Sequence, residues 1–265
     1  MSDVGPDLYA GLERAAKVAT LLVASDLDGA LAEFTLDPRD TTPAPGGMEA
    51  LRRLAALPAT HVVVVSGRDV RTLRQLTGVG SADPILLIGS HGGESSDPAV
   101  TVDAPLDRGQ KALLDELSEQ VAELVEHHPG ARLERKHAAV TVHTRGLSED
   151  SAAATHAEAE LLGSDRAEVR VISGKSVVEL SVSSADKGTA LAALARHVDA
   201  DATFYCGDDV TDEDAFRALD PLTGDVTVKV GSGPTAAAHR VGSVSDVVAA
   251  LEQLLALREA AVRAS

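Results

Sequence analysis

Two aspartates directly follow a short apolar segment near the start of the chain. The segment Leu21–Ser25 leads into Asp26-Leu27-Asp28-Gly29. If this segment is a strand of a parallel sheet, both carboxylates reach the ligand crevice at its carboxyl end, where Gly29 opens a tight turn. Such a pair suits metal binding together with acid–base chemistry. The alternative is an ordinary turn, in which Asp and Gly are common.

A second acidic segment follows the apolar run Thr203–Cys206. Residues 208–214 hold five acids in seven positions: Asp208, Asp209, Asp212, Glu213 and Asp214. Their mutual repulsion is costly unless a cation or a basic side chain lies among them. Oxygen ligands alone favour Mg²⁺ over zinc. For Glu213 and Asp214 we favour the simpler interpretation, that they are acids of a first helical turn.

Groups suited to a phosphate follow two other segments. Ser66-Gly67-Arg68 comes after Val62–Val65 and offers a hydroxyl, an amide and a guanidinium, although Ser is also an ordinary helix N-cap. Lys187 opens a helical segment, where a cation opposes the helix dipole, so its ammonium has either another partner or only solvent. We interpret Cys206 as a small buried apolar residue, because no histidine lies near it in the sequence.

The elements that carry these motifs alternate between strand and helix patterns. Apolar runs at Leu21–Ser25, Val62–Val65 and Ile85–Ile88 predict buried strands separated by helices, and the same alternation returns from Asp186 onward. We therefore expect an α/β fold with a doubly wound, Rossmann-like parallel sheet. The middle of the chain predicts a smaller α+β unit with one open sheet face. The expected domains are a core over residues 1–104 and 184–265 and an inserted cap over residues 105–183.

Composition limits the possible partners. The 265 residues include 41 Asp and Glu against 24 Lys and Arg, a formal charge of −17, and only 2% aromatic residues. We expect no nucleic-acid partner, because the surface repels phosphates and lacks aromatic platforms for bases. A single cysteine excludes an intrachain disulfide, and no apolar run approaches a membrane span or a signal peptide. We expect a cytoplasmic protein without a membrane partner, and the oligomeric state stays open.

The order of the strand-end motifs resembles that of the haloacid dehalogenase superfamily of phosphohydrolases. The closer resemblance is to trehalose-6-phosphate phosphatases, and it covers nearly the full chain. The matching stretches are Val65 to Arg68, Gly89-Ser90-His91-Gly92, Leu133 to Lys136, Val140 to His143, Gly174 to Leu180, Asp186-Lys187-Gly188 and Tyr205 to Phe216. The last two are highly specific in combination.

The resemblance implies a mechanism residue by residue. Asp26 would attack phosphorus to give an aspartyl-phosphate, and Asp28 would protonate the leaving sugar oxygen and then deprotonate water. Ser66, the Gly67 amide and Lys187 would hold the phosphoryl oxygens, with Arg68 as a further cation. A Mg²⁺ cofactor would be bound by the Asp26 and Asp208 carboxylates and the Asp28 carbonyl. The carboxylates of Asp209 and Asp212 would orient waters and pair with Lys187.

The cap would recognise the sugar of trehalose 6-phosphate. Because the chain has so few aromatic residues, this recognition would depend on polar side chains, for which the candidates are His91, Glu134, Arg135, Lys136, Lys175 and Glu179. An alternative is another sugar phosphate, of the sucrose or mannosyl-glycerate type, since only the cap selects the substrate. We also expect hinges near residues 92–105 and 183–186, so that the cap excludes water during the reaction.

One departure from the family pattern affects the first motif. Ala30 stands where the family usually has threonine, so a hydroxyl beside the nucleophile is missing. Loss of one neutral hydrogen bond is worth about 0.5–1.5 kcal/mol, at most roughly tenfold in rate. We therefore favour an active enzyme over a weakly active regulatory homologue. A receiver-like phosphoacceptor is a third alternative, against which the long insertion argues.

Overall fold

The computed structural model describes residues 4–35, 37–100, 106–174 and 176–264. The chain forms two compact units, one of Met1–Val102 together with Ala185–Ser265 and the other of Asp103–Ser184. We call them the large unit and the small unit.

The large unit is built on a seven-stranded sheet with the strand order β11-β10-β9-β1-β2-β3-β4. All pairs are parallel except β3 with β4. The prediction of an α/β fold with a doubly wound, mostly parallel sheet is confirmed. The strands are β1 (Leu21–Ser25), β2 (Thr60–Val65), β3 (Ile85–Gly89), β4 (Glu94–Ser95), β9 (Ala202–Gly207), β10 (Val226–Val230) and β11 (His239–Val241).

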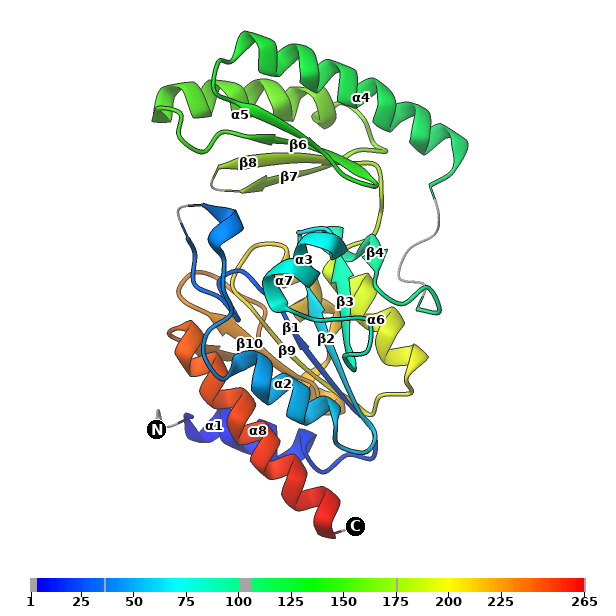
Figure 1. The fold of residues 1–265 in the computed structure, drawn as a ribbon, viewed down its shortest axis with the longest axis vertical. Helices are drawn as coiled ribbons and strands as arrows, with labels where there is room; N and C mark the ends of the chain where they lie inside the picture. The colour runs from blue at the N-terminus through cyan, green and yellow to red at the C-terminus, as the bar shows by residue number, and fades with distance from the viewer. Residues whose placement is uncertain (1–3, 36, 101–105, 175, 265) are drawn as a thin grey trace. The chain divides into compact units, whose positions relative to one another are not determined.

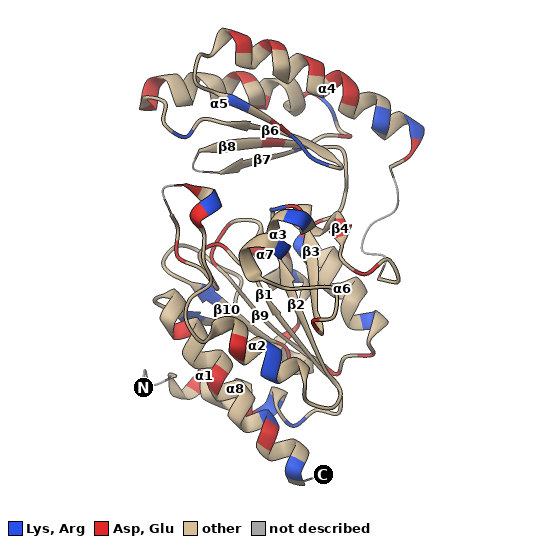
Figure 2. Cartoon of the chain, in the orientation of Figure 1, with Lys and Arg blue, Asp and Glu red and all other residues tan. Residues whose placement is uncertain are grey.

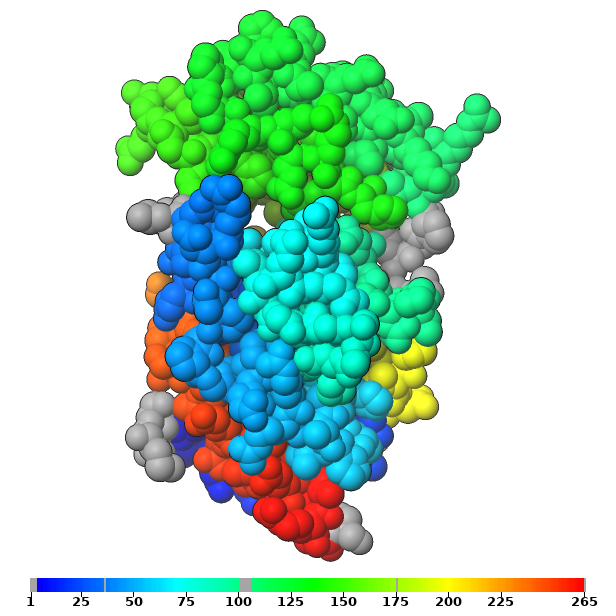
Figure 3. Space-filling model, in the orientation of Figure 1, coloured from blue at the N-terminus to red at the C-terminus, as the bar shows by residue number. Residues whose placement is uncertain are grey.

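Helices cover both faces of this sheet, which is why its central strands are apolar on both sides (Figure 1). On β1, Leu21 and Val23 face one apolar cluster, and Leu22 and Ala24 face another. The first cluster includes residues of α1 (Pro6–Ala15), α2 (Gly47–Ala55), α3 (Val70–Thr77) and α8 (Val244–Ala264). The second includes residues of α6 (Lys187–His197) and α7 (Asp212–Ala218). In the space-filling view, α2 and α8 lie side by side on one surface of the large unit (Figure 3).

Turns at the carboxyl ends of the parallel strands carry the sequence motifs. Asp26 follows β1, Ser66 follows β2 and Asp208 follows β9. Short 3₁₀ turns occur in the described part of the large unit at Pro38–Asp40, Ser90–Gly92 and Pro221–Thr223.

The small unit has one antiparallel four-stranded sheet with the order β5-β6-β8-β7. Its helices α4 (Arg108–His127) and α5 (Glu149–Ser164) pack on one face, over Val140, Val142 and Leu180. Acidic residues occur along both helices (Figure 2). The strands are β5 (Arg132–Arg135), β6 (Ala139–His143), β7 (Arg170–Gly174) and β8 (Val177–Ser181). Among the residues described, no helix combines the length and the apolarity needed to cross a membrane.

Candidate functional site

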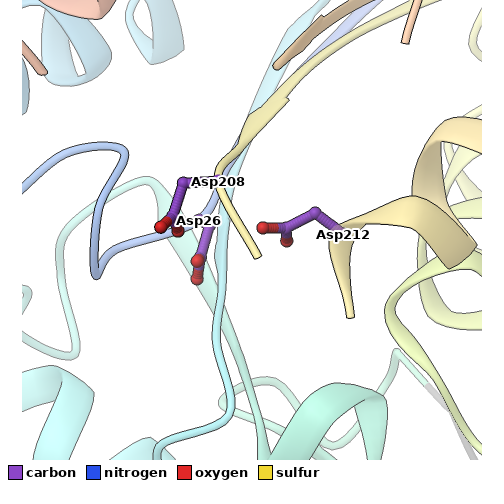
Figure 4. Close-up of side chains that lie close together, drawn as sticks. All are labelled: Asp26, Asp208 and Asp212. Carbon is purple, nitrogen blue, oxygen red and sulfur yellow. The ribbon is translucent and has the colours of Figure 1, made fainter. Parts of the chain in front are cut away.

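Three carboxylates meet where β1 and β9 end. These strands are parallel neighbours, with Ser25 opposite Cys206, so Asp26 and Asp208 emerge at the same edge of the sheet. Asp212, the first residue of α7, points toward them (Figure 4). The three side chains offer oxygens that all lie within 4.8 Å of one another. The sequence therefore brings acids from two separate motifs into one cluster.

Two glycines make room for this cluster. Gly29 has φ +79°, and a Cβ at this position would lie 2.2 Å from Cγ of Asp208. A Cβ on Gly207 would lie 2.2 Å from Cγ of Asp212. Any larger residue would displace a carboxylate, so both glycines are required by close approach.

A buried lysine supplies the positive charge. The Nζ of Lys187 lies 2.6 Å from Oδ1 of Asp212 and 3.2 Å from Oδ1 of Asp26, and the lysine side chain is only 2% exposed. The Oη of Tyr205 donates to the same Oδ1 of Asp212 at 2.6 Å. Although Lys187 opens a helix, its neighbour Asp186 provides the N-cap. Of the two possibilities for Lys187, the structure has the ion-paired one.

Burial and charge shift the pKa values of the cluster in different directions. Burial raises the pKa of Asp26 well above its ordinary value; Lys187 opposes this rise, and the neighbouring carboxylates add to it. Burial, followed by Asp212, raises the pKa of Asp208 to about 7. Burial would also raise the pKa of Asp212, but the ion pair with Lys187 lowers it below its ordinary value. Lys187 thus compensates the charge of Asp212 more than the charges of the other two acids. For these two acids to be ionised together, a further cation is needed.

The residues fit a divalent cation that prefers oxygen ligands. Oδ1 of Asp208 is buried and has no hydrogen-bond partner among the described residues. Both oxygens of Asp212, in contrast, already accept hydrogen bonds, from Lys187 and Tyr205 and from the Asp209 amide. An all-oxygen donor set of this kind matches Mg²⁺.

The Asp28 side chain is held outside this cluster. Nε and Nη2 of Arg68 donate to its two oxygens, each at 2.6 Å. Arg68 also donates from Nη2 to Oγ1 of Thr41 and from Nη1 to the carbonyl of Pro38, each at 2.9 Å. Arg68, which the sequence placed with the phosphate ligands, is here the partner of Asp28.

The ends of β2 and β3 form a second part of the site. Ser66 is buried, its Oγ accepts from the Arg68 amide at 3.2 Å, and its carbonyl accepts from the His91 amide at 3.0 Å. The His91 ring packs over Gly67, where a Cβ would lie 2.4 Å from Cε1 of the ring. Ser66, Gly67 and His91 are therefore adjacent.

The remaining acids of the second segment differ from one another. Asp209 is exposed, and its carboxylate caps the amide of Val210. Asp214 pairs with Arg217 on the surface of α7, as expected for a first-turn acid. Glu213 is also a first-turn acid of α7, but it is only 8% exposed and accepts from the amide of Ala236. The spacing did not reveal this, because the loop that covers Glu213 lies more than twenty residues later in the chain.

The predicted sugar ligands of the small unit divide between the two sheet faces. Glu134, Thr141 and Glu179 form one cross-strand row on the face without helices. There, Oε2 of Glu179 accepts from Lys136 at 2.6 Å and from Thr141 at 3.1 Å. Arg135 lies opposite Val140 in register, on the helix-covered face, so it does not join them. Lys175 lies outside the described residues.

Three side chains of the site received no role from the sequence: Thr41, Tyr205 and Lys229. Tyr205 is one of two tyrosines and lies in an apolar strand, and Lys229 interrupts the valines of β10. A polar group within a buried strand was a signal that could have found both. Thr41 gave no such signal, because it lies in a loop rich in polar residues.

Comparison with known proteins gives a consistent result. The sequence model of the trehalose-phosphatase family matches residues 24–246. A trehalose-phosphate phosphatase of Mycobacterium tuberculosis is 33% identical over 253 residues, which are 91% of this chain and 63% of that protein. An uncharacterized glycosyl hydrolase of the same species is 36% identical over 223 residues, which are 80% of this chain and 16% of that protein. The chain thus spans less than two thirds of the length of these relatives.

The fold has a counterpart among solved structures. The C-terminal domain of the trehalose-6-phosphate phosphatase of C. albicans superimposes with a TM-score of 0.76 at 23% identity, covering 95% of this chain and 96% of that one.

Proposed function

Because this chain belongs to the trehalose-phosphatase family, we propose that it hydrolyses trehalose 6-phosphate to trehalose and phosphate. The observation that carries this proposal is the convergence of Asp26, Asp208 and Lys187 at the ends of β1 and β9, with a buried Asp208 oxygen that has no partner among the described residues. Anionic and cationic groups are thereby placed together for a phosphate ester.

A divalent cation, Mg²⁺, would be held by the carboxylates of Asp26 and Asp208 and by the carbonyl of Asp28. When bound, it supplies positive charge that reduces the repulsion between the nucleophilic carboxylate and the phosphoryl oxygens. Asp212 holds Lys187 in place rather than binding the cation, because its oxygens are already engaged.

Asp26 is the proposed nucleophile. One of its oxygens forms a bond to phosphorus while the bond between phosphorus and the sugar oxygen breaks, and Asp28 donates a proton to that oxygen. A water molecule then attacks phosphorus, the bond to Asp26 breaks, and Asp28 takes the proton of the water. Lys187, the Ser66 hydroxyl and the Gly67 amide stabilise the phosphoryl oxygens throughout.

Arg68 affects the proton transfers through its ion pair with Asp28. Its guanidinium donates to both carboxylate oxygens of Asp28. Because Asp28 gives a proton to the sugar oxygen in the first step, it must then be released from Arg68, and Arg68 becomes available to the incoming phosphate.

The small unit is proposed to select the sugar, through Glu134, Lys136 and Glu179 on its face without helices. Arg135, Lys175 and His91 remain proposed sugar ligands. The division into a core and a cap, with hinges near residues 92–105 and 183–186, and a cytoplasmic location belong to the same proposal.

The test is phosphate release from a panel of trehalose 6-phosphate, sucrose 6-phosphate and glucose 6-phosphate, with Mg²⁺ and with EDTA. We expect a preference for trehalose 6-phosphate of at least tenfold in kcat/KM, and loss of turnover in EDTA and in Asp26→Asn. Equal rates on the three sugars would contradict the substrate. Full activity of Asp26→Asn would contradict the nucleophile, and sugar-phosphate binding without turnover would favour a regulatory homologue.

A further inference from the structure

Lys229 is a buried lysine in the otherwise apolar strand β10. Its neighbours Val228 and Val230 face the apolar cluster of α1, α2 and α8, so the lysine points to the opposite face of the sheet. It is 5% exposed and lies in register with Gly207, one residue before Asp208. The strand pairing therefore fixes this ammonium beside the loop that carries the acids.

The ammonium bonds to the backbone of an acidic residue rather than to a carboxylate. Nζ of Lys229 donates to the carbonyl of Asp208. Among the described residues it forms no ion pair within 4.0 Å. A buried ammonium without a carboxylate partner is costly. At the same time, Oδ1 of Asp208 is buried and has no partner in the described part of the chain. The lysine thus fixes the Asp208 peptide and leaves its carboxylate available.

We propose that Lys229 is a positioning residue for Asp208: by holding the Asp208 peptide, it points the carboxylate across Gly29 toward Asp26 and keeps it available to a divalent cation. Lys187 acts differently, because it engages the carboxylates of Asp212 and Asp26 directly. The identity of the cation as Mg²⁺ rests on the proposed function.

The direction in which the Kd for Mg²⁺ changes on removal of Lys229 distinguishes a positioning role from a purely electrostatic one. If Lys229 acted only through its charge, its removal would take away repulsion and Mg²⁺ would bind more tightly. If it positions Asp208, removal lets the peptide turn, and Mg²⁺ binds more weakly. We expect the second result.

The experiment is calorimetric titration of Mg²⁺ into the full chain at neutral pH without sugar phosphate. Lys229→Met keeps the length and apolar volume of the side chain but removes the donor, and we expect its Kd for Mg²⁺ to rise at least tenfold. The matched control is Thr227→Val. Thr227 lies on the same face of β10 and is fully buried, and its Oγ1 accepts from the Ala238 amide, so this variant loses a hydrogen bond without touching Asp208. We expect it to lower Tm and to keep Kd within twofold.

An unchanged or lower Kd in Lys229→Met would overturn the positioning role, as would an equal rise in Thr227→Val. If Lys229→Met does not fold, Lys229→Gln is judged by the same criterion, because its amide is too short to keep the contact. A wild-type chain that binds no Mg²⁺ would contradict both this inference and the proposed metal. A wild-type chain that binds Mg²⁺ as tightly as Lys229→Met does would contradict the inference alone.

Discussion

Replacing Lys187 with methionine tests how strongly the buried cluster depends on one cation. The ammonium lies 2.6 Å from Asp212 and 3.2 Å from Asp26, and the three side chains are 2%, 0% and 6% exposed, so water cannot replace it. Methionine fills a similar volume, and the loss therefore comes from carboxylates left unpaired. Breaking a buried pair in this way costs about 3–5 kcal/mol in the free energy of unfolding.

The assay is urea unfolding followed by far-ultraviolet circular dichroism, in EDTA so that no metal replaces the lost charge. A second substitution separates the effect of charge from that of packing. In Lys187→Met/Asp212→Asn the unpaired negative charge at position 212 is removed, and the asparagine oxygen still accepts the hydrogen bond of Tyr205. We expect the double variant to be more stable than Lys187→Met by at least about 1 kcal/mol, since an unpaired buried charge is removed.

The sign of the pH dependence follows from the lowered pKa of Asp212. A lowered pKa contributes stability above the unfolded-state value, and this contribution is lost as the pH falls through the folded-state value. The deficit of Lys187→Met should therefore be largest at neutral pH and should shrink in acid. A deficit below about 1 kcal/mol at neutral pH in EDTA, where the unpaired charges should cost most, would refute the reasoning.

Three further predictions concern other residues of the large unit. Gly29→Ala should raise the Kd for Mg²⁺ at least tenfold in a calorimetric titration, because the new methyl group would overlap the Asp208 carboxylate; unchanged binding would contradict the close approach. Cys206 is fully buried, and burial raises the pKa of its thiol to about 12, so a disulfide reagent at pH 8 should modify it only in urea; rapid labelling of the native chain would count against this. Arg258→Ala should lower the unfolding free energy by about 3 kcal/mol or more, because Arg258 is 3% exposed and its loss removes hydrogen bonds to several backbone carbonyls, among them that of buried Ala16; kcat per folded molecule should stay unchanged, and equal urea midpoints would argue against the contacts.

The central strands could be predicted because they are buried on both faces. β1 matches the predicted segment Leu21–Ser25, and β2 and β9 contain the predicted runs Val62–Val65 and Thr203–Cys206. The edge strands β4, β5 and β11 could not be found in this way. β5 has the sequence Arg-Leu-Glu-Arg and is largely exposed, and β4 and β11 have only two and three residues, so no continuous apolar pattern marks them.

The sequence predicts those parts of the site whose position follows from where a strand ends. A strand end sets where Asp26 and Asp208 leave the sheet, and the structure brings them together. It does not set where the next side chain points, and for this reason the pairing of Asp28 with Arg68, forty positions later, was missed. The burial of Glu213 was missed for the same reason, because its partner Ala236 comes from a loop that the local sequence does not reveal.

The register between β1 and β9 also determines when the acid cluster can form. Ser25 and Cys206 are partners across 181 positions of sequence, and the whole small unit lies between them. During synthesis β1, β2 and β3 leave the ribosome first, and the small unit follows before β9 exists. Closing so long a loop is slow and has an entropic cost. We therefore expect Asp26 to lie at the edge of an incomplete sheet until β9 pairs with β1, and we expect this pairing, which brings Asp208 beside Asp26, to be among the last events of folding.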